Sequence, residues 1–258
     1  MVKMNLPLPS PYELTARLRP ALLTILPGLV LAAVWLPEVW TVLGGLGTLL
    51  GGCGVTYLFA QLARHRGKKL EARFAEDGPA LTKTLLRHAD ERIDPLTKRR
   101  YHTLLAGQHG LEVPTQDEEA ADAQAADLRY GACVTWLLEA TRDEKKFKLL
   151  LQENTAYGFR RNLLALKPIA VPILVVALMA NAVAIVVTWG SLDTKTTTAM
   201  VVELALVGAL AMWIFVVTRE FFAAASLAYG RRLLAACDQL AIKPAKVSRA
   251  KKGKDAAA

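Results

Sequence analysis

The stretch PIAVPILVVALMANAVAIVVTWGSL, residues 168–192, runs for 25 residues without a charged side chain. A hydrocarbon core about 30 Å thick is crossed by about 20 helical residues. Three other runs, residues 20–37, 39–63 and 196–218, are similarly apolar, and the last contains one charge, Glu203. Buried core helices of soluble proteins rarely continue so far without a charge, so four membrane spans are favoured over four core helices.

The composition separates this chain from three other classes of protein. Of its 258 residues 53% are apolar, and 32 Lys and Arg against 23 Asp and Glu give a net charge of +9. A disordered chain would have fewer apolar residues, and a disulfide-stapled secreted module would have more than three cysteines. A compact soluble protein would distribute its apolar residues periodically, whereas here they are concentrated in blocks.

Very short links connect the apolar runs in pairs. Glu38 lies between the first two runs, and residues 193–195 lie between the last two, so we expect two helical hairpins. The fold class is therefore all-α: a polytopic membrane protein with four transmembrane helices and a helical cytoplasmic domain. Its predicted segments are an N-terminal segment (1–19), hairpin 1 (20–63), a central helical domain (64–167), hairpin 2 (168–218) and a helix with a basic tail (219–258).

The positions of Lys and Arg predict the orientation of the spans. These residues are abundant in the N-terminal, central and C-terminal segments, whereas the two hairpin tips share only Lys195. By the positive-inside rule, both termini and the central domain are expected in the cytoplasm. Trp35, Trp40 and Trp189 lie near the expected outer interface, where aromatic rings are favoured. The first apolar run starts too far into the chain, and is too long, for a cleaved signal peptide.

The central segment has the pattern of a helical hub that joins the two hairpins. Asp94 followed by Pro95 is typical of a helix start, and a helix over residues 96–106 is expected to end at Gly107. No run of alternating β-branched residues indicates a strand. The segment is too small, and too polar at its ends, for a large independent enzyme.

Two capping boxes predict further helix starts. Thr-Gln-Asp-Glu at residues 115–118 predicts an alanine-rich helix to about Ala140, and the carboxylates of residues 117–119 suit the start of that helix. Thr-Arg-Asp-Glu at residues 141–144 predicts another, running towards the membrane. After span four we expect a helix to about Leu240, then a basic stretch, residues 243–254, that either is solvated or binds anionic lipid or nucleic acid.

No catalytic or metal-binding pattern stands out. His65, His88, His102 and His109 lack zinc-site spacing with cysteine or carboxylate residues, and the chain has neither a phosphate-binding GxxxxGK[ST] loop nor a GxSxG motif. The three cysteines need no disulfide in the reducing cytoplasm and the membrane. We therefore expect no enzyme activity, cofactor or metal. A lipid-modifying enzyme is the alternative, because catalytic groups can converge without a local motif.

Polar and small residues within the spans are candidate pore or packing residues. Six glycines lie within residues 44–54, and Gly47 and Gly51 among them form a GxxxG pattern, which indicates close helix packing, within one chain or between chains, or a helix that bends at a gate. Glu203 either forms an acidic, cation-selective ring in an oligomer or is hydrogen-bonded between helices. Asn181 is either an interhelical hydrogen-bonding group or a pore group.

Basic residues gather in the central segment, including three lysines at positions 145, 146 and 148. Lys98, Arg99 and Arg100 adjoin Tyr101, and positive charge beside an aromatic ring suits a phosphate backbone or an exposed base, although a solvated helix face has the same pattern. Arg160 and Arg161 precede span three, where lipid headgroups and topology are the alternative explanation. The candidate residues for a nucleic-acid ligand are Arg87, Lys98, Arg99, Arg100, Tyr101, Arg160 and Arg161.

Two stretches carry a family resemblance. They are LLRHAD (85–90) with DPLTKRRYH (94–102), and ENTAYGFRRNLLALK (153–167) entering span three. They resemble the membrane effectors of Hailong-type bacterial anti-phage defence systems, which are small four-helix membrane proteins found beside nucleotidyltransferases. The resemblance covers residues 12–240, and the second stretch is the more distinctive.

The resemblance implies an oligomeric, tetrameric, channel-like effector in the bacterial inner membrane. It also implies that a partner nucleotidyltransferase makes short single-stranded DNA, which binds the effector and keeps it closed. Loss of that ligand during infection would open the pore and depolarise the cell. No family ligand residues transfer position by position. A non-conducting membrane scaffold, or a subunit of a transporter complex, is the alternative function.

Overall fold

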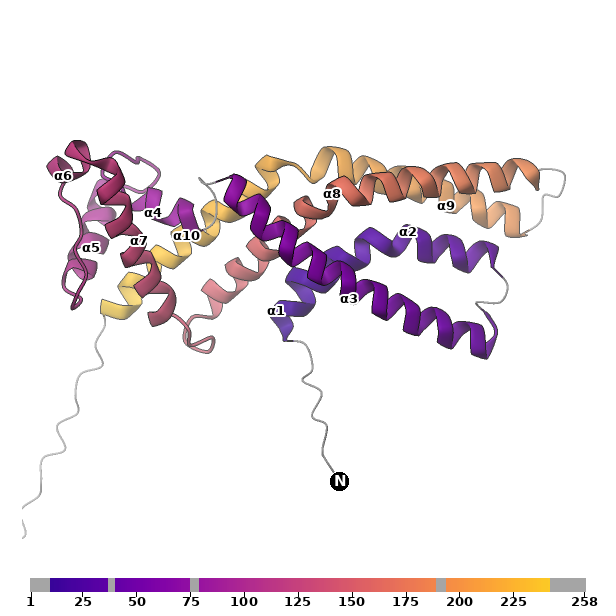
Figure 1. Cartoon of the computed structure of the whole chain (residues 1–258), viewed down its shortest axis with the longest axis horizontal. Coiled ribbons are helices and arrows are strands. Elements are labelled where there is room, and N and C mark those ends of the chain that lie inside the picture. Colours follow the sequence, from indigo (N-terminus) through magenta and orange to yellow (C-terminus); the bar gives the residue numbers. More distant parts are fainter. Residues whose placement is uncertain (1–9, 37–39, 75–78, 189–193, 242–258) are drawn as a thin grey trace, which may run out of the picture.

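The computed structural model describes residues 10–36, 40–74, 79–188 and 194–241, and these residues form helices and turns with no β-strand among them. Four helical stretches are long and apolar enough to cross a membrane: Pro11–Trp35, Gly44–Arg73, Lys148–Val187 and Thr194–Val216. The all-α fold with four such helices is therefore confirmed. Figure 1 shows the apolar helices extending to one side as two hairpins, with a helical head at the other end.

The first hairpin begins earlier than the apolar run that predicts it. Helix α1 (Pro11–Glu13) starts at a capping box between Ser10 and Glu13, and a π-helical turn, η1 (Leu14–Leu18), leads directly into α2 (Arg19–Trp35). Helix α3 (Val42–Arg73) then returns and continues ten residues beyond the predicted end of span two at residue 63. Glu38, between the two helices, lies outside the described residues.

The second hairpin contains the longest helix of the molecule. Helix α8 (Lys148–Val187) is 40 residues long and includes Pro168 and Pro172 without ending at either. Helix α9 (Thr194–Ala211) returns and passes into a π-helical turn, η3 (Met212–Val216), before a bend and α10 (Arg219–Ala241). The tip residues Trp189 and Asp193, and the basic stretch 243–254, lie outside the described residues.

Lys167 stabilises the bend between η3 and α10. Its ammonium donates to the carbonyl oxygens of Ile214 at 3.0 Å and Val217 at 2.8 Å. These are carbonyls near the end of a helical stretch, where regular intrahelical partners run out. The helix predicted after span four is present as α10, and a bend separates it from η3 and α9.

The head consists of α4 (Pro79–Leu86), α5 (Pro95–Ala106), α6 (Gln116–Ala121) and α7 (Ala123–Ala140), packed around the far end of α10. Asp94 caps α5 by accepting from the Thr97 amide at 2.8 Å, as predicted. The predicted capping box between Thr115 and Glu118 is also present at the start of α6.

Two predictions for the head are wrong. The single alanine-rich helix is broken at Asp122, which adopts an extended conformation and accepts from the amides of residues 124 and 125 to start a new helix, α7. The second capping box does not form, because the Thr141 hydroxyl donates back to the Leu137 carbonyl at 2.7 Å and so belongs to the end of α7. Asp143 instead accepts from the amides of the following turn, and α8 starts at Lys148.

Helix α8 belongs to both hydrophobic cores. Leu150 and Tyr157 lie in the head core, whereas Leu163, Leu166 and Leu174 lie in the core shared by the apolar helices. The predicted segment boundaries at residues 63/64 and 167/168 therefore fall inside α3 and α8, where the backbone is continuous.

Candidate functional site

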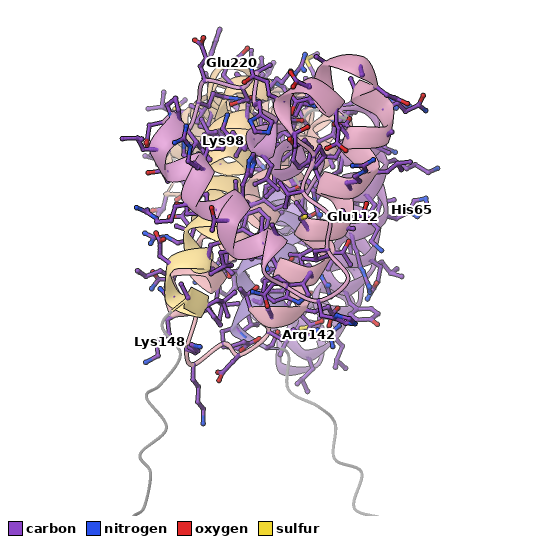
Figure 2. All side chains as sticks on the ribbon, turned by 90° about the vertical axis from the view of Figure 1, so that its left-hand side faces the viewer. His65, Lys98, Glu112, Arg142, Lys148 and Glu220 are labelled. Atoms are coloured by element: carbon purple, nitrogen blue, oxygen red, sulfur yellow. The ribbon has the colours of Figure 1, made fainter. Side chains whose placement is uncertain are left out.

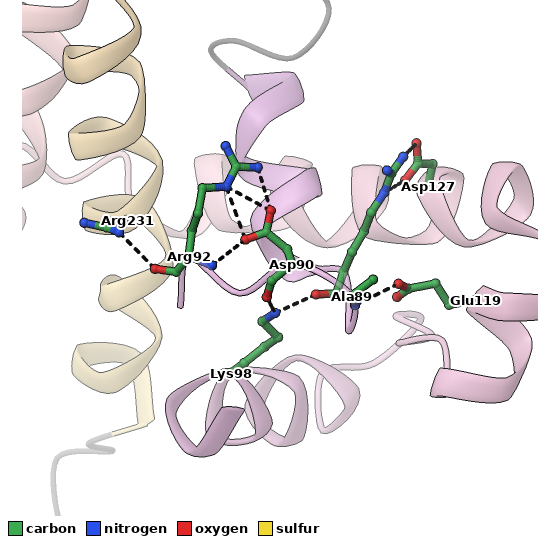
Figure 3. Close-up of polar contacts among 8 residues, drawn as sticks. Ala89, Asp90, Arg92, Lys98, Glu119, Asp127 and Arg231 are labelled. Carbon is green, nitrogen blue, oxygen red and sulfur yellow. Dashed lines mark hydrogen bonds and ion pairs between the residues drawn. The ribbon is translucent and has the colours of Figure 1, made fainter. Parts of the chain in front are cut away.

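Lys98, Arg99 and Arg100 lie together on α5, and we call them the 98–100 cluster. Lys98 is only 4% exposed. Its ammonium donates to the carbonyl oxygen of Arg87 at 2.6 Å and to that of Asp90, so it fastens the chain between α4 and α5 (Figure 3). Burial lowers the pKa of Lys98 below its ordinary value, against the opposing influence of the Asp90 and Glu119 charges. Lys98 is therefore an internal structural cation.

The other residues of this predicted ligand surface differ in accessibility. The Arg100 guanidinium pairs with Asp238 of α10, with Nε 2.8 Å from Oδ1, and it lies 5.8 Å from the centroid of the Tyr101 ring. Tyr101 itself is buried in the head core. Arg99 is exposed and forms no ion pair among the described residues. Arg99 is thus the one member of the cluster whose charge faces solvent without a partner in the described part of the chain.

Arg87 also has an internal partner. Its Nε donates to Oδ1 of Asp127 on α7 at 2.7 Å. The hydrogen bond to Asp127 raises the pKa of Arg87, and the same hydrogen bond holds the pKa of Asp127 below its ordinary value. The pair ties the end of α4 to α7.

Glu119 is the centre of a buried polar network that its sequence position does not reveal. It is 8% exposed, and its carboxylate accepts from the amides of His88 at 2.8 Å and Ala89 at 3.3 Å and from the Tyr130 hydroxyl at 2.7 Å. Burial alone would raise the pKa of Glu119, but these hydrogen bonds outweigh it and lower the pKa. Glu119 therefore holds the α4–α5 connection against α6 and α7.

A pocket of about 650 Å³ lies beside this network. Both His88 and His102 border it, and their rings meet edge to face with centroids 4.8 Å apart. Burial lowers the pKa of His102, so its ring is neutral at neutral pH. Charges of both signs line the pocket: Asp90, Glu91, Lys98 and Arg99. This balance gives the pocket no preference for an anion.

Arg160 and Arg161 bind helices of the same chain. The Arg160 guanidinium lies 4.2 Å from the centroid of the Phe221 ring and donates to the Phe221 carbonyl oxygen at 3.0 Å. Arg161 pairs with Glu71 of α3 at 2.8 Å. These two arginines thus join α8 to α10 and to α3.

Three polar side chains meet between the apolar helices. Asn181 of α8 is fully buried, and its Nδ2 donates to the Ala199 carbonyl oxygen at 2.9 Å and to Oε2 of Glu203 at 2.8 Å. Its Oδ1 accepts from Nε1 of Trp35 at 2.8 Å. Asn181 therefore links α2, α8 and α9, and within the chain Glu203 has the hydrogen-bonded environment that was one of its two predicted alternatives.

The GxxxG pair faces away from the other described helices of the chain. A methyl group built at Gly47 or Gly51 would meet no atom within 4 Å in the described structure. The pattern therefore brings no second helix of the described part of the chain close. Its two alternatives, packing against another chain and bending at a gate, are both compatible with an outward-facing position.

A smaller pocket at the start of α8, of about 130 Å³, was not predicted from the sequence. We call it the α8 pocket. Its polar lining residues are Lys145, Lys146, Lys148, Arg232 and Gln239. The run of lysines is visible in the sequence, but Arg232 and Gln239 come from α10, and only the fold brings them to the same place. Figure 2 shows Lys148 beside the end of α10.

Together these features define an all-helical protein, in the described residues, with four helices able to cross a membrane and a head whose hydrophobic core includes the start of α8. Among the described residues, no three His, Cys, Asp or Glu side chains come together as a metal site. No family model, curated protein or solved structure matches the chain.

Proposed function

We propose that this chain is the subunit of an oligomeric, ion-conducting membrane effector of anti-phage defence. In this proposal the head faces the cytoplasm and binds a short single-stranded DNA, or another nucleotide ligand, made by a partner nucleotidyltransferase. The bound ligand keeps a tetrameric pore in the inner membrane closed, and its loss depolarises the cell. The identities of the ligand and the enzyme come from the family resemblance of residues 85–102 and 153–167.

The observation that carries the proposal is the continuity of α8 between the two cores. Leu150 and Tyr157 pack in the head, and Leu166 and Leu174 of the same helix pack among the apolar helices. A ligand that favours one position of α8 in the head therefore also favours one position of its apolar half. The size of that shift is set by the difference in ligand affinity between the two arrangements.

Two features of the apolar helices support an assembly of several subunits. One four-helix subunit has little room for a central pore, so conduction requires several copies around an axis. The outward-facing Gly47 and Gly51 offer a surface on which a second helix can approach closely. Glu203 supplies a carboxylate inside an apolar helix, where a charge is costly unless it faces protein or water.

The test is ion flux through liposomes that contain the purified full-length protein. We expect flux in the absence of ligand and its suppression by short single-stranded DNA, with a stronger effect at low salt because phosphate contacts release counterions. Glu203→Gln should change the ion selectivity of this flux. Absence of flux under both conditions would contradict the channel, and flux indifferent to DNA at low salt would contradict the DNA ligand.

The alternative function is a non-conducting scaffold or a subunit of a transporter complex. One observation favours it: Glu203, Asn181 and Trp35 already satisfy one another within a single subunit. The scaffold predicts that the protein alone conducts no ions, whereas the channel predicts flux with the same preparation. In that case Glu203→Gln would lower the stability of the protein without any conductance to alter.

A further inference from the structure

We infer that the α8 pocket binds a phosphate group of a soluble ligand. The inference rests on the proposed function for the identity of that ligand, a short single-stranded DNA, but the affinity of the pocket for phosphate follows from its own residues. It assigns ligand contact to Lys146, Lys148 and Arg232, none of which is among the candidate ligand residues predicted from the sequence.

Charge is the first argument. Four cations line the α8 pocket, namely Lys145, Lys146, Lys148 and Arg232, and no carboxylate lines it. In the described part of the chain, none of the four forms an ion pair with an acidic side chain. Four neighbouring charges of the same sign repel one another, so an anion that enters the pocket relieves the repulsion and gains charge-assisted hydrogen bonds.

The nearby acidic residues do not cancel this charge. The carboxylate of Asp143 accepts from the backbone amides of Lys145 at 2.9 Å and Lys146 at 3.1 Å. It is therefore directed at the turn, and its partners are these amides and not the lysine ammonium groups. Glu144 is exposed and borders a different pocket. Asp238 of α10 pairs with Arg100.

The pocket walls are rigid enough to act as a site. Phe147 is 4% exposed, and its buried ring lies 5.2 Å from the Lys146 ammonium. On one wall Leu150 belongs to the head core, and on the other wall so does Ala236. Lys148 and Arg232 are therefore mounted on two helices whose backbones are held by the same core, and Lys145 and Lys146 lie in the turn directly before α8, which reduces the entropy lost when a ligand binds.

Size and lining favour phosphate over a base. A volume of about 130 Å³ is the room of about four water molecules, which suits a phosphate group and is too small for a nucleoside. The one aromatic side chain in the lining, Phe147, is buried, so it offers no open face for stacking. The planar guanidinium of Arg232 can form two parallel hydrogen bonds to phosphate oxygens, and the lysines act as point charges.

Distance from the apolar helices favours a soluble phosphate over a lipid headgroup. Lys167 is the last charged residue before the apolar run of α8. At about 1.5 Å per residue, Lys148 lies roughly 28 Å along the helix from Lys167. Figure 1 shows the start of α8 on the side of the head, away from the ends of the hairpins.

The position of the α8 pocket gives phosphate binding a consequence for the apolar helices. Its lysines lie at or beside the start of α8, which continues as one apolar helix, and Arg232 lies on α10, which connects through the bend at Lys167 to α9. A phosphate held from both walls fixes the separation of α8 and α10. It thereby favours one arrangement of the second hairpin over others.

The experiment compares ligand binding by the purified full chain with binding by Lys146→Gln/Lys148→Gln/Arg232→Gln. The probes are a short 5′-phosphorylated oligothymidylate and pyrophosphate, and the matched control is Lys69→Gln, which removes an exposed cation of α3 outside the pocket. We expect the triple variant to bind both probes at least about tenfold more weakly, because it loses several charge-assisted contacts. Its affinity for the oligonucleotide should also depend less steeply on salt, and the control should match the parent.

The outcomes separate this inference from the proposed function. Equal binding of both probes by the parent and the triple variant would overturn the phosphate site. Binding of pyrophosphate through the pocket without binding of the oligonucleotide would support the site and contradict the DNA ligand. Displacement of the oligonucleotide by anionic phospholipid but not by pyrophosphate would overturn the assignment of the pocket to a soluble ligand. If the triple variant fails to fold, Lys148→Gln alone, at an exposed position, makes the same comparison with a smaller expected loss.

Discussion

The 98–100 cluster and the α8 pocket are both rich in Lys and Arg and both lie in the head, but their charges have different partners. Lys98 is buried against two backbone carbonyls, and Arg100 pairs with Asp238. The lysines of the α8 pocket face a cavity without a lining carboxylate. A run of basic residues in a sequence therefore indicates a ligand site only when the fold leaves its charges without internal partners.

The local backbone explains this difference. The 98–100 cluster lies within α5, where the Lys98 side chain reaches the carbonyls of the preceding α4–α5 connection. The lysines of the α8 pocket lie in and just after a turn whose acidic residue, Asp143, is occupied by backbone amides. In the 98–100 cluster the Lys98 side chain donates to backbone carbonyls. In the α8 pocket the Asp143 carboxylate accepts from backbone amides instead, so the cations are left free to bind a ligand.

The largest effect is expected from Lys98→Met, which tests whether Lys98 is structural. The variant keeps most of the side-chain volume but leaves the carbonyls of Arg87 and Asp90 without their donor, at a cost of about 2 kcal/mol in the free energy of unfolding of the head. Urea unfolding of the detergent-solubilised protein, followed by alkylation of the buried Cys133, measures this change.

The matched control for this prediction is the neighbouring Arg99→Met, which removes an exposed charge. We expect it to change the free energy of unfolding by less than about 0.5 kcal/mol. If the two variants were equally stable and Lys98→Met alone lost affinity for oligonucleotide, Lys98 would be a ligand residue and the contrast between the two regions would disappear.

A smaller loss is expected from Asn181→Leu, which tests internal pairing among the apolar helices. The substitution removes the donor to Glu203 and the acceptor for Trp35, and interhelical hydrogen bonds of this kind contribute about 1 kcal/mol. Thermal unfolding in detergent measures the loss. The control is Val176→Leu at an exposed position of the same helix, which should leave the unfolding temperature unchanged. An Asn181→Leu variant as stable as the parent would mean that the three side chains do not hold α2, α8 and α9 together.

The smallest expected effect is the pH dependence of the free energy of unfolding of the head between about pH 7 and pH 5. Burial lowers the pKa of His102 in the folded head, whereas the unfolded chain takes up the proton near the ordinary value of about 6.5. The unfolded state thus binds more protons below that pH, so stability falls as the pH drops from 6.5 through the lowered pKa. The pKa of Glu119 is also lowered in the folded head, so its contribution to stability is lost only as the pH falls below about 4.5.

Urea midpoints at several pH values measure this dependence. His102→Gln, which can still donate to the Leu86 carbonyl, should flatten it, and His65→Asn at an exposed position of α3 should not. A dependence that persists unchanged in His102→Gln would assign the titration to another group.

The sequence predicts the fold well where the signal is local. The long apolar runs, the Asp94 cap and the Thr115 capping box all appear in the structure, because length and capping chemistry act over a few residues. The break at Asp122 was missed because an acidic residue inside an alanine-rich run can either continue the helix or cap a new one, and here it caps. Helices α3 and α8 continue past the apolar runs that end at residue 63 and begin at residue 168, because a helix can leave an apolar run without any change in backbone.

The site is less predictable, because its partners are distant in sequence. The burial of Lys98 depends on carbonyls of residues 87 and 90, which no side-chain pattern encodes. Arg161 pairs with Glu71 on another helix. The α8 pocket likewise needs Arg232 from α10. Sequence composition counts these charges, but only packing decides which of them are paired.

We propose that a phosphate ligand held in the α8 pocket controls ion flux through the apolar helices. The most direct test of this proposal is a titration of liposome ion flux with short single-stranded DNA for the parent, Lys69→Gln and Lys148→Gln/Arg232→Gln. We expect the same half-effective DNA concentration for the parent and Lys69→Gln, and a concentration at least about tenfold higher for the pocket variant. Equal half-effective concentrations for all three proteins would contradict it.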